Sequence, residues 1–140
     1  MTPRRAAQWE VNKRIGQRVR WIRDAHEEHD RFHNSQAQWA TSLDIPPSDL
    51  SRYERGEKLI PVDFIITISQ LSGATEQYLL YGVLDETDRM EPWLRKALKE
   101  RPHQSPAEAE RQRQAALRIV RLRRNQARPR LVAAKGRQIV

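Results

Sequence analysis

Apolar residues recur every three or four positions through most of this chain, which is the spacing of amphipathic helices. The pattern predicts a first helix from about 11 to 29 after a frayed N-terminal arm, a second and a third within 35–56, a fourth over 61–72 and a fifth after Thr75. The predicted fold class is therefore all-α. The residues expected to face the core are Ile15, Val19 and Ile22, then Trp39, Ala40 and Leu43, then Leu50 and Tyr53, then Phe64, Ile65, Ile68 and Leu71, and finally Tyr78, Leu79 and Tyr81.

A tight turn with clear end signals joins the second and third helices. Ser35 suits the N-cap of the second helix, because its hydroxyl can accept a bond from a backbone N–H of the first turn. Asp44 stands where the chain must bend, and Asp adopts left-handed backbone conformation more cheaply than most residues. Pro47 suits the first position of the third helix, and Gly56 suits the position just past its end. The polar side chains left pointing outward are Ser48, Asp49, Arg52 and Arg55.

A short polar helix supported by a preceding helix is the geometry that enters the major groove of DNA. The same spacing fits an ordinary helical hairpin in an all-α domain. Spacing alone does not decide between these two interpretations.

Three blocks of sequence carry a more specific signal. They are Ile15 to Arg23, Ser35 to Gly56 with its run Leu-Ser-Arg-Tyr-Glu-Arg-Gly, and Pro61 to Gly82 with its run Tyr-Leu-Leu-Tyr-Gly. The blocks resemble the helix-turn-helix of phage-repressor and Cro-like regulators, the XRE family. The resemblance implies a five-helix lambda-repressor-like DNA-binding domain over 11–83. It also implies a sequence-specific regulator of transcription, a repressor, of bacterial or phage origin.

The resemblance also implies which residues meet the phosphates and the bases of DNA. Gln36, at the start of the supporting helix, and Arg55, near the end of the recognition helix, align with positions that contact phosphate. Base edges would be met by Ser48 and Arg52. Arg52 is the favoured candidate, because arginine donates two hydrogen bonds to guanine O6 and N7.

Two further residues of the third helix could act at the bases or support them. Pro47 could touch a thymine methyl, and Asp49 could accept a hydrogen bond from cytosine N4 or could hold the neighbouring arginine. Arg23 aligns with a family position whose arginine pairs with a glutamate at the end of the recognition helix, here Glu54. The alternative is a surface arginine that contributes little to stability.

The chain departs from the family pattern in three places. Asp44 replaces the turn glycine. Pro46 replaces the usual polar N-cap of the recognition helix, so Ser48 could cap that helix instead. The link between Arg23 and Gln36 is longer than in the family. These departures bear on where the recognition helix starts.

The longer link contains three histidines, His26, His29 and His33, which would share a face with Asp30 if the first helix continued. Imidazole and carboxylate at that spacing could ligate zinc or nickel. A solvated helix extension is the favoured interpretation, so no metal site is predicted. Phe32 is expected to turn inward and anchor the loop.

The C-terminal part is predicted to be a basic helical extension of the domain. A linker over 83–87 precedes a short helix over 90–100 and a longer helix that Ser105 caps. The segment 88–126 is a candidate dimerisation element, and 127–140 is predicted to be a basic flexible tail. The apolar residues expected to hold a homodimer are Trp93, Leu94, Leu98 and those of the 105–126 helix.

Composition and charge narrow the function classes. The net charge of the 140 residues is +8, yet residues 101–140 hold eleven Lys or Arg against two Glu, and residues 1–100 sum to −1. No apolar run approaches the length of a membrane span and no signal peptide is visible, so we expect a cytoplasmic, nucleoid-associated protein with no membrane contact. An RNA-binding or nucleic-acid-coating protein that uses the Arg-rich segment is the alternative function.

Nothing in the sequence predicts an enzyme. The chain has no cysteine, no Gly-rich phosphate loop and no plausible pair of nucleophile and base. We therefore expect no catalytic residue and no cofactor, and the expected partners are a double-stranded DNA operator and a second copy of the chain.

Overall fold

The computed structural model describes residues 2–30 and 35–139, with side chains up to residue 126. Within these residues the protein is all-α, as predicted. An isolated parallel β-bridge joins Val83 and Gln104. The predicted position of Phe32 lies outside the described residues. The helices are α1 (Pro3–His29), α2 (Gln36–Ser42), α3 (Pro47–Glu54), α4 (Val62–Ser72), α5 (Glu76–Tyr81), α6 (Pro92–Lys99) and α7 (Pro106–Ile139).

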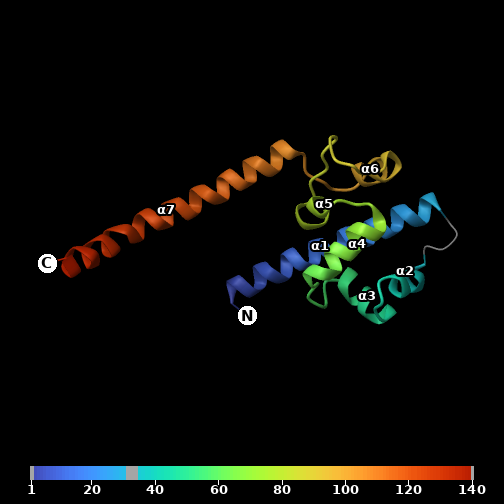
Figure 1. Ribbon diagram of the computed structural model, residues 1–140, viewed down its shortest axis with the longest axis horizontal. Coiled ribbons are helices and arrows are strands. Elements are labelled where there is room, and N and C mark those ends of the chain that lie inside the picture. Colours follow the sequence, from blue (N-terminus) through green and yellow to red (C-terminus); the bar gives the residue numbers. More distant parts are fainter. Residues whose placement is uncertain (1, 31–34, 140) are drawn as a thin grey trace. The chain divides into compact units, whose positions relative to one another are not determined.

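The chain divides into two compact units, unit 1 (Met1–Ser105) and unit 2 (Pro106–Val140). In unit 1, α1 packs against α3, α4, α5 and α6, and α2 packs against α3. Figure 1 shows α1 between the α2–α3 pair on one side and α5 with α6 on the other. The long first helix is therefore the support on which the short helices are placed.

The predictions for the N-terminal arm and the linker are both wrong, because a local cap starts the first helix early and the linker packs into the core. α1 begins at Pro3 rather than near residue 11, since the Thr2 hydroxyl accepts a bond from the Arg5 N–H at 3.3 Å and Pro3 suits the first helical position. The expected linker at 83–87 opens with Val83 and Leu84, and both are buried.

The segment after α5 belongs to the core of unit 1 instead of forming a separate extension. Leu94 and Leu98 of α6 are fully buried, and Met90 is buried just before the helix. The first unit consequently runs to Ser105, past the boundary expected at residue 83. The side chains expected to hold a dimer through α6 are used inside one chain.

Two residues expected in the core lie on the surface. Leu71 is 45% exposed, because the buried stripe of α4 runs through Phe64, Ile68 and Ser72 and leaves Leu71 at its edge. The Ser72 hydroxyl is satisfied there by the Ala74 N–H at 3.1 Å. Tyr81, the last residue of α5, is 60% exposed, and the other residues predicted to face the core are buried.

Unit 2 is the single helix α7, which continues to Ile139 instead of ending near residue 126. The segment 127–139, expected to be a flexible tail, is therefore helical, and α7 runs through Pro129 instead of ending before it. The side chains from 110 to 126 are all exposed. None of the helices in the described residues is long and apolar enough to cross a membrane.

Candidate nucleic-acid interface

The candidate interface starts at a well-formed capping box at the head of α2. The Ser35 hydroxyl accepts from the Gln38 N–H at 3.2 Å, and the Gln38 side-chain oxygen accepts from the Ser35 N–H at 3.0 Å. This exchange satisfies two N–H groups at the helix start that would otherwise lack partners. It confirms the predicted N-cap and places Gln36, half-exposed, as the first residue of α2.

The turn after α2 is built on Asp44, whose φ of 55° confirms the predicted left-handed conformation. The Ile45 N–H donates to the Ala40 carbonyl at 3.0 Å, and the Asp44 N–H donates to the Thr41 carbonyl at 3.1 Å. This pair of bonds is the Schellman pattern, which closes the end of α2. Ile45 then packs against the core, so the direction in which α3 leaves the turn is fixed.

α3 begins at Pro47, with Pro46 at the N-cap position and no side-chain cap. Ser48 does not cap the helix, and its side chain is exposed. The last residue of the helix is Glu54, and Gly56 stands just past the C-cap, as predicted, with a φ of 73°. The Gly56 N–H donates to the Tyr53 carbonyl at 3.1 Å and the Glu57 N–H to the Arg52 carbonyl at 2.9 Å, a second Schellman pattern.

The inner face of α3 lies directly on α1. Leu50 and Tyr53 are buried, as predicted. At Gly16 of α1, an added Cβ would stand 2.0 Å from the Tyr53 carbonyl oxygen, so the two backbones meet with no room for a side chain. The absence of a side chain at this one position of α1 therefore sets how closely α3 approaches.

The predicted pair of Arg23 and Glu54 is present and two-pronged. Arg23 Nε donates to Glu54 Oε2 at 3.0 Å, and Nη2 donates to Oε1 at 2.8 Å. The Arg23 side chain is 14% exposed and the Glu54 side chain only 4%. The hydrogen bond to Glu54 raises the pKa of Arg23, so the guanidinium stays charged, and the pair ties the end of α3 to α1.

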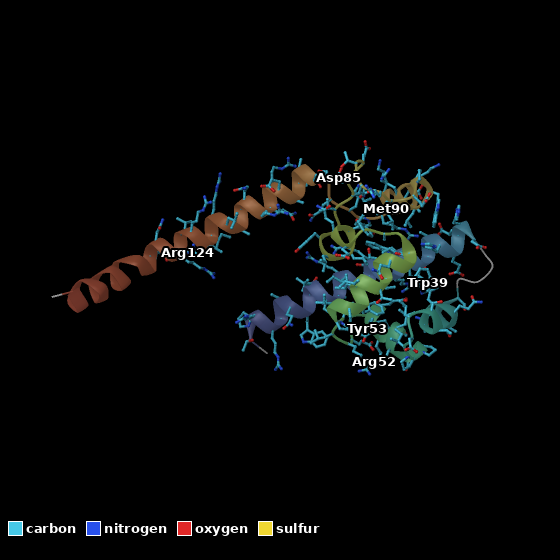
Figure 2. All side chains as sticks on the ribbon, viewed as in Figure 1. Trp39, Arg52, Tyr53, Asp85, Met90 and Arg124 are labelled. Atoms are coloured by element: carbon cyan, nitrogen blue, oxygen red, sulfur yellow. The ribbon has the colours of Figure 1, made fainter. Side chains whose placement is uncertain are left out.

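The outer face of α3 presents one arginine that has no side-chain partner in the described part of the chain. Arg52 is exposed, and it makes no ion pair or hydrogen bond among the described side chains. Asp49 does not hold it, because the Asp49 carboxylate binds Lys58 Nζ at 3.1 Å. Figure 2 shows Arg52 at the outer margin of α3, with Tyr53 turned toward the rest of unit 1.

Arg55 is also exposed, but it pairs with Glu57 at 3.2 Å. An exposed pair of this kind contributes about 0–1 kcal/mol. Arg55 can therefore exchange its carboxylate for a phosphate at little cost. The six predicted contact residues lie along the span from the head of α2 to the end of α3, with Gln36 and Arg55 at its two ends.

Two residues that support α3, Asn12 and Lys58, were not predicted from the sequence. The buried Asn12 amide donates from Nδ2 to the Lys58 carbonyl at 3.0 Å, and its Oδ1 accepts from the Ile60 N–H at 2.8 Å. Lys58 Nζ also lies 5.6 Å from the centre of the Tyr53 ring. The signal in the sequence was a lone amide three residues before Ile15, on the apolar face of α1.

Two histidines of the longer link, His26 and His29, pack against tryptophans. His26 lies edge-on to Trp39 and Trp93, at centroid distances of 5.2 and 4.9 Å, and His29 stacks on Trp93 at 3.8 Å. His26 Nε2 is 2.8 Å from the Ser72 carbonyl, which can only accept, so Nε2 carries a proton. Burial lowers the pKa of His26. Among the described residues no group of three potential ligands could hold a metal, and His33 lies outside them.

Comparisons with protein families, with curated proteins and with solved structures gave no match to this chain.

Proposed function

We propose that this chain is a sequence-specific double-stranded DNA-binding regulator of transcription, a repressor of bacterial or phage origin. The observation that carries the proposal is Arg52, an exposed arginine with no side-chain partner among the described residues, on a short helix whose other face is fixed to α1. The resemblance to phage-repressor and Cro-like regulators supports it, with α1 to α5 as a five-helix lambda-repressor-like arrangement. In this proposal the protein binds rather than catalyses, and works in the cytoplasm on the nucleoid.

The proposed roles follow the direction of each side chain on the α2–α3 span. Arg52 donates to guanine O6 and N7, and Ser48 beside it meets a neighbouring base. Pro47 touches a thymine methyl. Asp49 reads cytosine N4 only after it leaves Lys58, which makes it the weakest of the four base contacts. Phosphates flank the set, with Gln36 at one end and Arg55 at the other.

We propose a homodimer on paired half-sites about one helical turn apart. The surface for it is not α6, whose leucines are buried, but α7, which exposes apolar side chains along its length. A chain that ends at Ser105 keeps the whole of unit 1 and should sediment as a monomer, whereas the full chain should dimerise. The apolar residues exposed on α7 are Leu117, Ile119, Val120 and Leu122.

Selection of bound fragments from a genomic library, at a stated salt concentration, tests the proposal. A DNA regulator should recover a recurrent palindromic site and should bind it far more tightly than random duplex. Equal recovery of all fragments would count against sequence-specific reading by α3.

An RNA-binding or nucleic-acid-coating function is the second candidate, and the basic charge of α7 favours it. Residues 111–140 hold ten Lys or Arg and no acid, and the described arginines of α7 are exposed. Arginine-rich segments bind structured RNA. Tighter binding to structured RNA than to any duplex, abolished by removal of α7, would favour this candidate over the first.

A further inference from the structure

Unit 1 contains a cavity of about 320 Å³ that lies apart from the α2–α3 span. One face of α1 forms half of its wall, and Gly82 after α5 and the 102–104 segment complete it. Its volume is at the lower end of ligand pockets, which are roughly 300–1,000 Å³. The side chains that define its chemistry are Arg14, Gln17, Arg18, Trp21 and His103.

Arg18 is the central group of this cavity. Its Nη1 donates to the carbonyls of Leu79 and Leu80, both at 3.1 Å, and thereby caps the end of α5. Capping accounts for only this one nitrogen. Nε and Nη2 of Arg18 have no acceptor among the described residues. Neither atom is fully buried, so both can be reached by solvent.

Gly82 keeps that side of the guanidinium open. A Cβ on Gly82 would stand 3.0 Å from Nη2 and 3.1 Å from Nε of Arg18. No carboxylate among the described residues pairs with Arg18, and burial together with the nearby Arg14 lowers its pKa. A half-buried cation in this position is stabilised by an anion that approaches from the cavity.

The other lining groups extend the positive charge and add a flat surface. Arg14 makes only a long, exposed pair with Glu10, at 3.5 Å. His103 Nδ1 donates to the Arg101 carbonyl at 2.8 Å, because a carbonyl can only accept. Trp21 contributes a half-buried indole. The cavity therefore combines two guanidinium groups with an aromatic face.

We infer that this cavity binds a small organic anion, a planar ring that carries a carboxylate or a phosphate. The anionic group lies on Arg18 and Arg14, where two-pronged bonds to a guanidinium are available. The ring lies against Trp21. The inference stands on the cavity alone and does not depend on the DNA-binding proposal.

Calorimetric titration of the full chain with matched probes tests this inference. The charged probes are adenosine 5′-monophosphate and salicylate, and their uncharged counterparts are adenosine and salicylamide. Each charged probe that fits should bind about tenfold or more tightly than its counterpart, since only the charged probe forms charge-assisted hydrogen bonds to the guanidinium groups. Inorganic phosphate alone should bind more weakly than either, because it lacks the ring.

Three variants separate a built site from general attraction. Arg18→Met should abolish binding, and Arg14→Gln, at an exposed position outside the α5 cap, should weaken it severalfold in a folded protein. Arg20→Gln is the matched control, an exposed α1 arginine that does not line the cavity, and should bind as the parent does. No binding of any charged probe at millimolar concentration, or equal loss in Arg14→Gln and Arg20→Gln, would overturn the inference.

Discussion

Arg52 is a cation on a surface where the neighbouring charges are paired. If it reads a guanine, Arg52→Ala should cost about 1–3 kcal/mol on the selected site and relax the preference at one base pair. Fluorescence anisotropy with the selected duplex and its single-base variants measures both effects. Arg89→Ala, at an exposed arginine before α6, is the control. A uniform loss on every sequence would make Arg52 a phosphate contact.

The Arg23–Glu54 pair should matter for stability far more than an exposed pair does. Removing one partner leaves a nearly buried charge, so either single change should cost about 3–5 kcal/mol. The exposed Lys99–Glu86 pair, at 2.9 Å, is the matched control, and removing either of its partners should change the stability far less. Double-mutant cycles in urea measure the coupling of each pair. Equal coupling in the two pairs would contradict the structural role of Arg23.

His26 should make stability depend on pH below neutrality. Burial lowers the pKa of His26, the bond to Ser72 opposes this change, and the nearby His29 adds to it. The unfolded chain therefore takes up a proton on His26 at a higher pH than the folded chain does. The stability that neutral His26 contributes is therefore fully present above about pH 6.5, and it is lost as the pH drops toward the pKa in the folded chain. Melting curves of the parent and His26→Gln between neutral and mildly acidic pH should show a weaker pH dependence in the variant.

At the scale of the helices, the contact between α1 and α3 depends on Gly16. A methyl group there would clash with the Tyr53 carbonyl, so Gly16→Ala should destabilise unit 1 by about 1–3 kcal/mol. Alanine is otherwise the better helix former by about 0.5–1 kcal/mol, so a stabilised variant would show that the contact gives way. Gln17→Ala, one residue further on at an exposed position, is the control for urea denaturation.

The ends of α2 and α3 could be predicted from the sequence, whereas the docking of α6 could not. The cap at Ser35, the left-handed Asp44 and the end at Gly56 were predictable, because each is fixed by local backbone chemistry. The docking of α6 was not, because a short amphipathic helix has the same pattern whether its leucines meet another chain or their own core. The Asp49–Lys58 pair depends likewise on the path of the loop after α3, which periodicity does not encode.

At the scale of the whole molecule, the net positive charge lies outside unit 1. Residues 1–105 sum to zero, and residues 106–140 carry the net +8. Figure 2 shows Arg124 projecting from α7 among the exposed side chains of that helix. A neutral unit 1 can make few phosphate contacts, so the salt dependence of binding should come mainly from α7.

Deleting residues 124–140 removes five Lys or Arg and keeps the exposed apolar residues of α7 that precede Arg124. If those charges lie on DNA, the slope of log affinity against log salt should flatten by about 0.9 for each phosphate that is no longer neutralised. Affinity for the selected site and for random duplex should fall by similar factors, because binding to phosphate carries no sequence information. A full-length variant with the same five residues changed to Gln separates the effect of the charge from that of the helix. An unchanged slope in both variants would show that this end of α7 does not touch DNA and that its cations serve another partner.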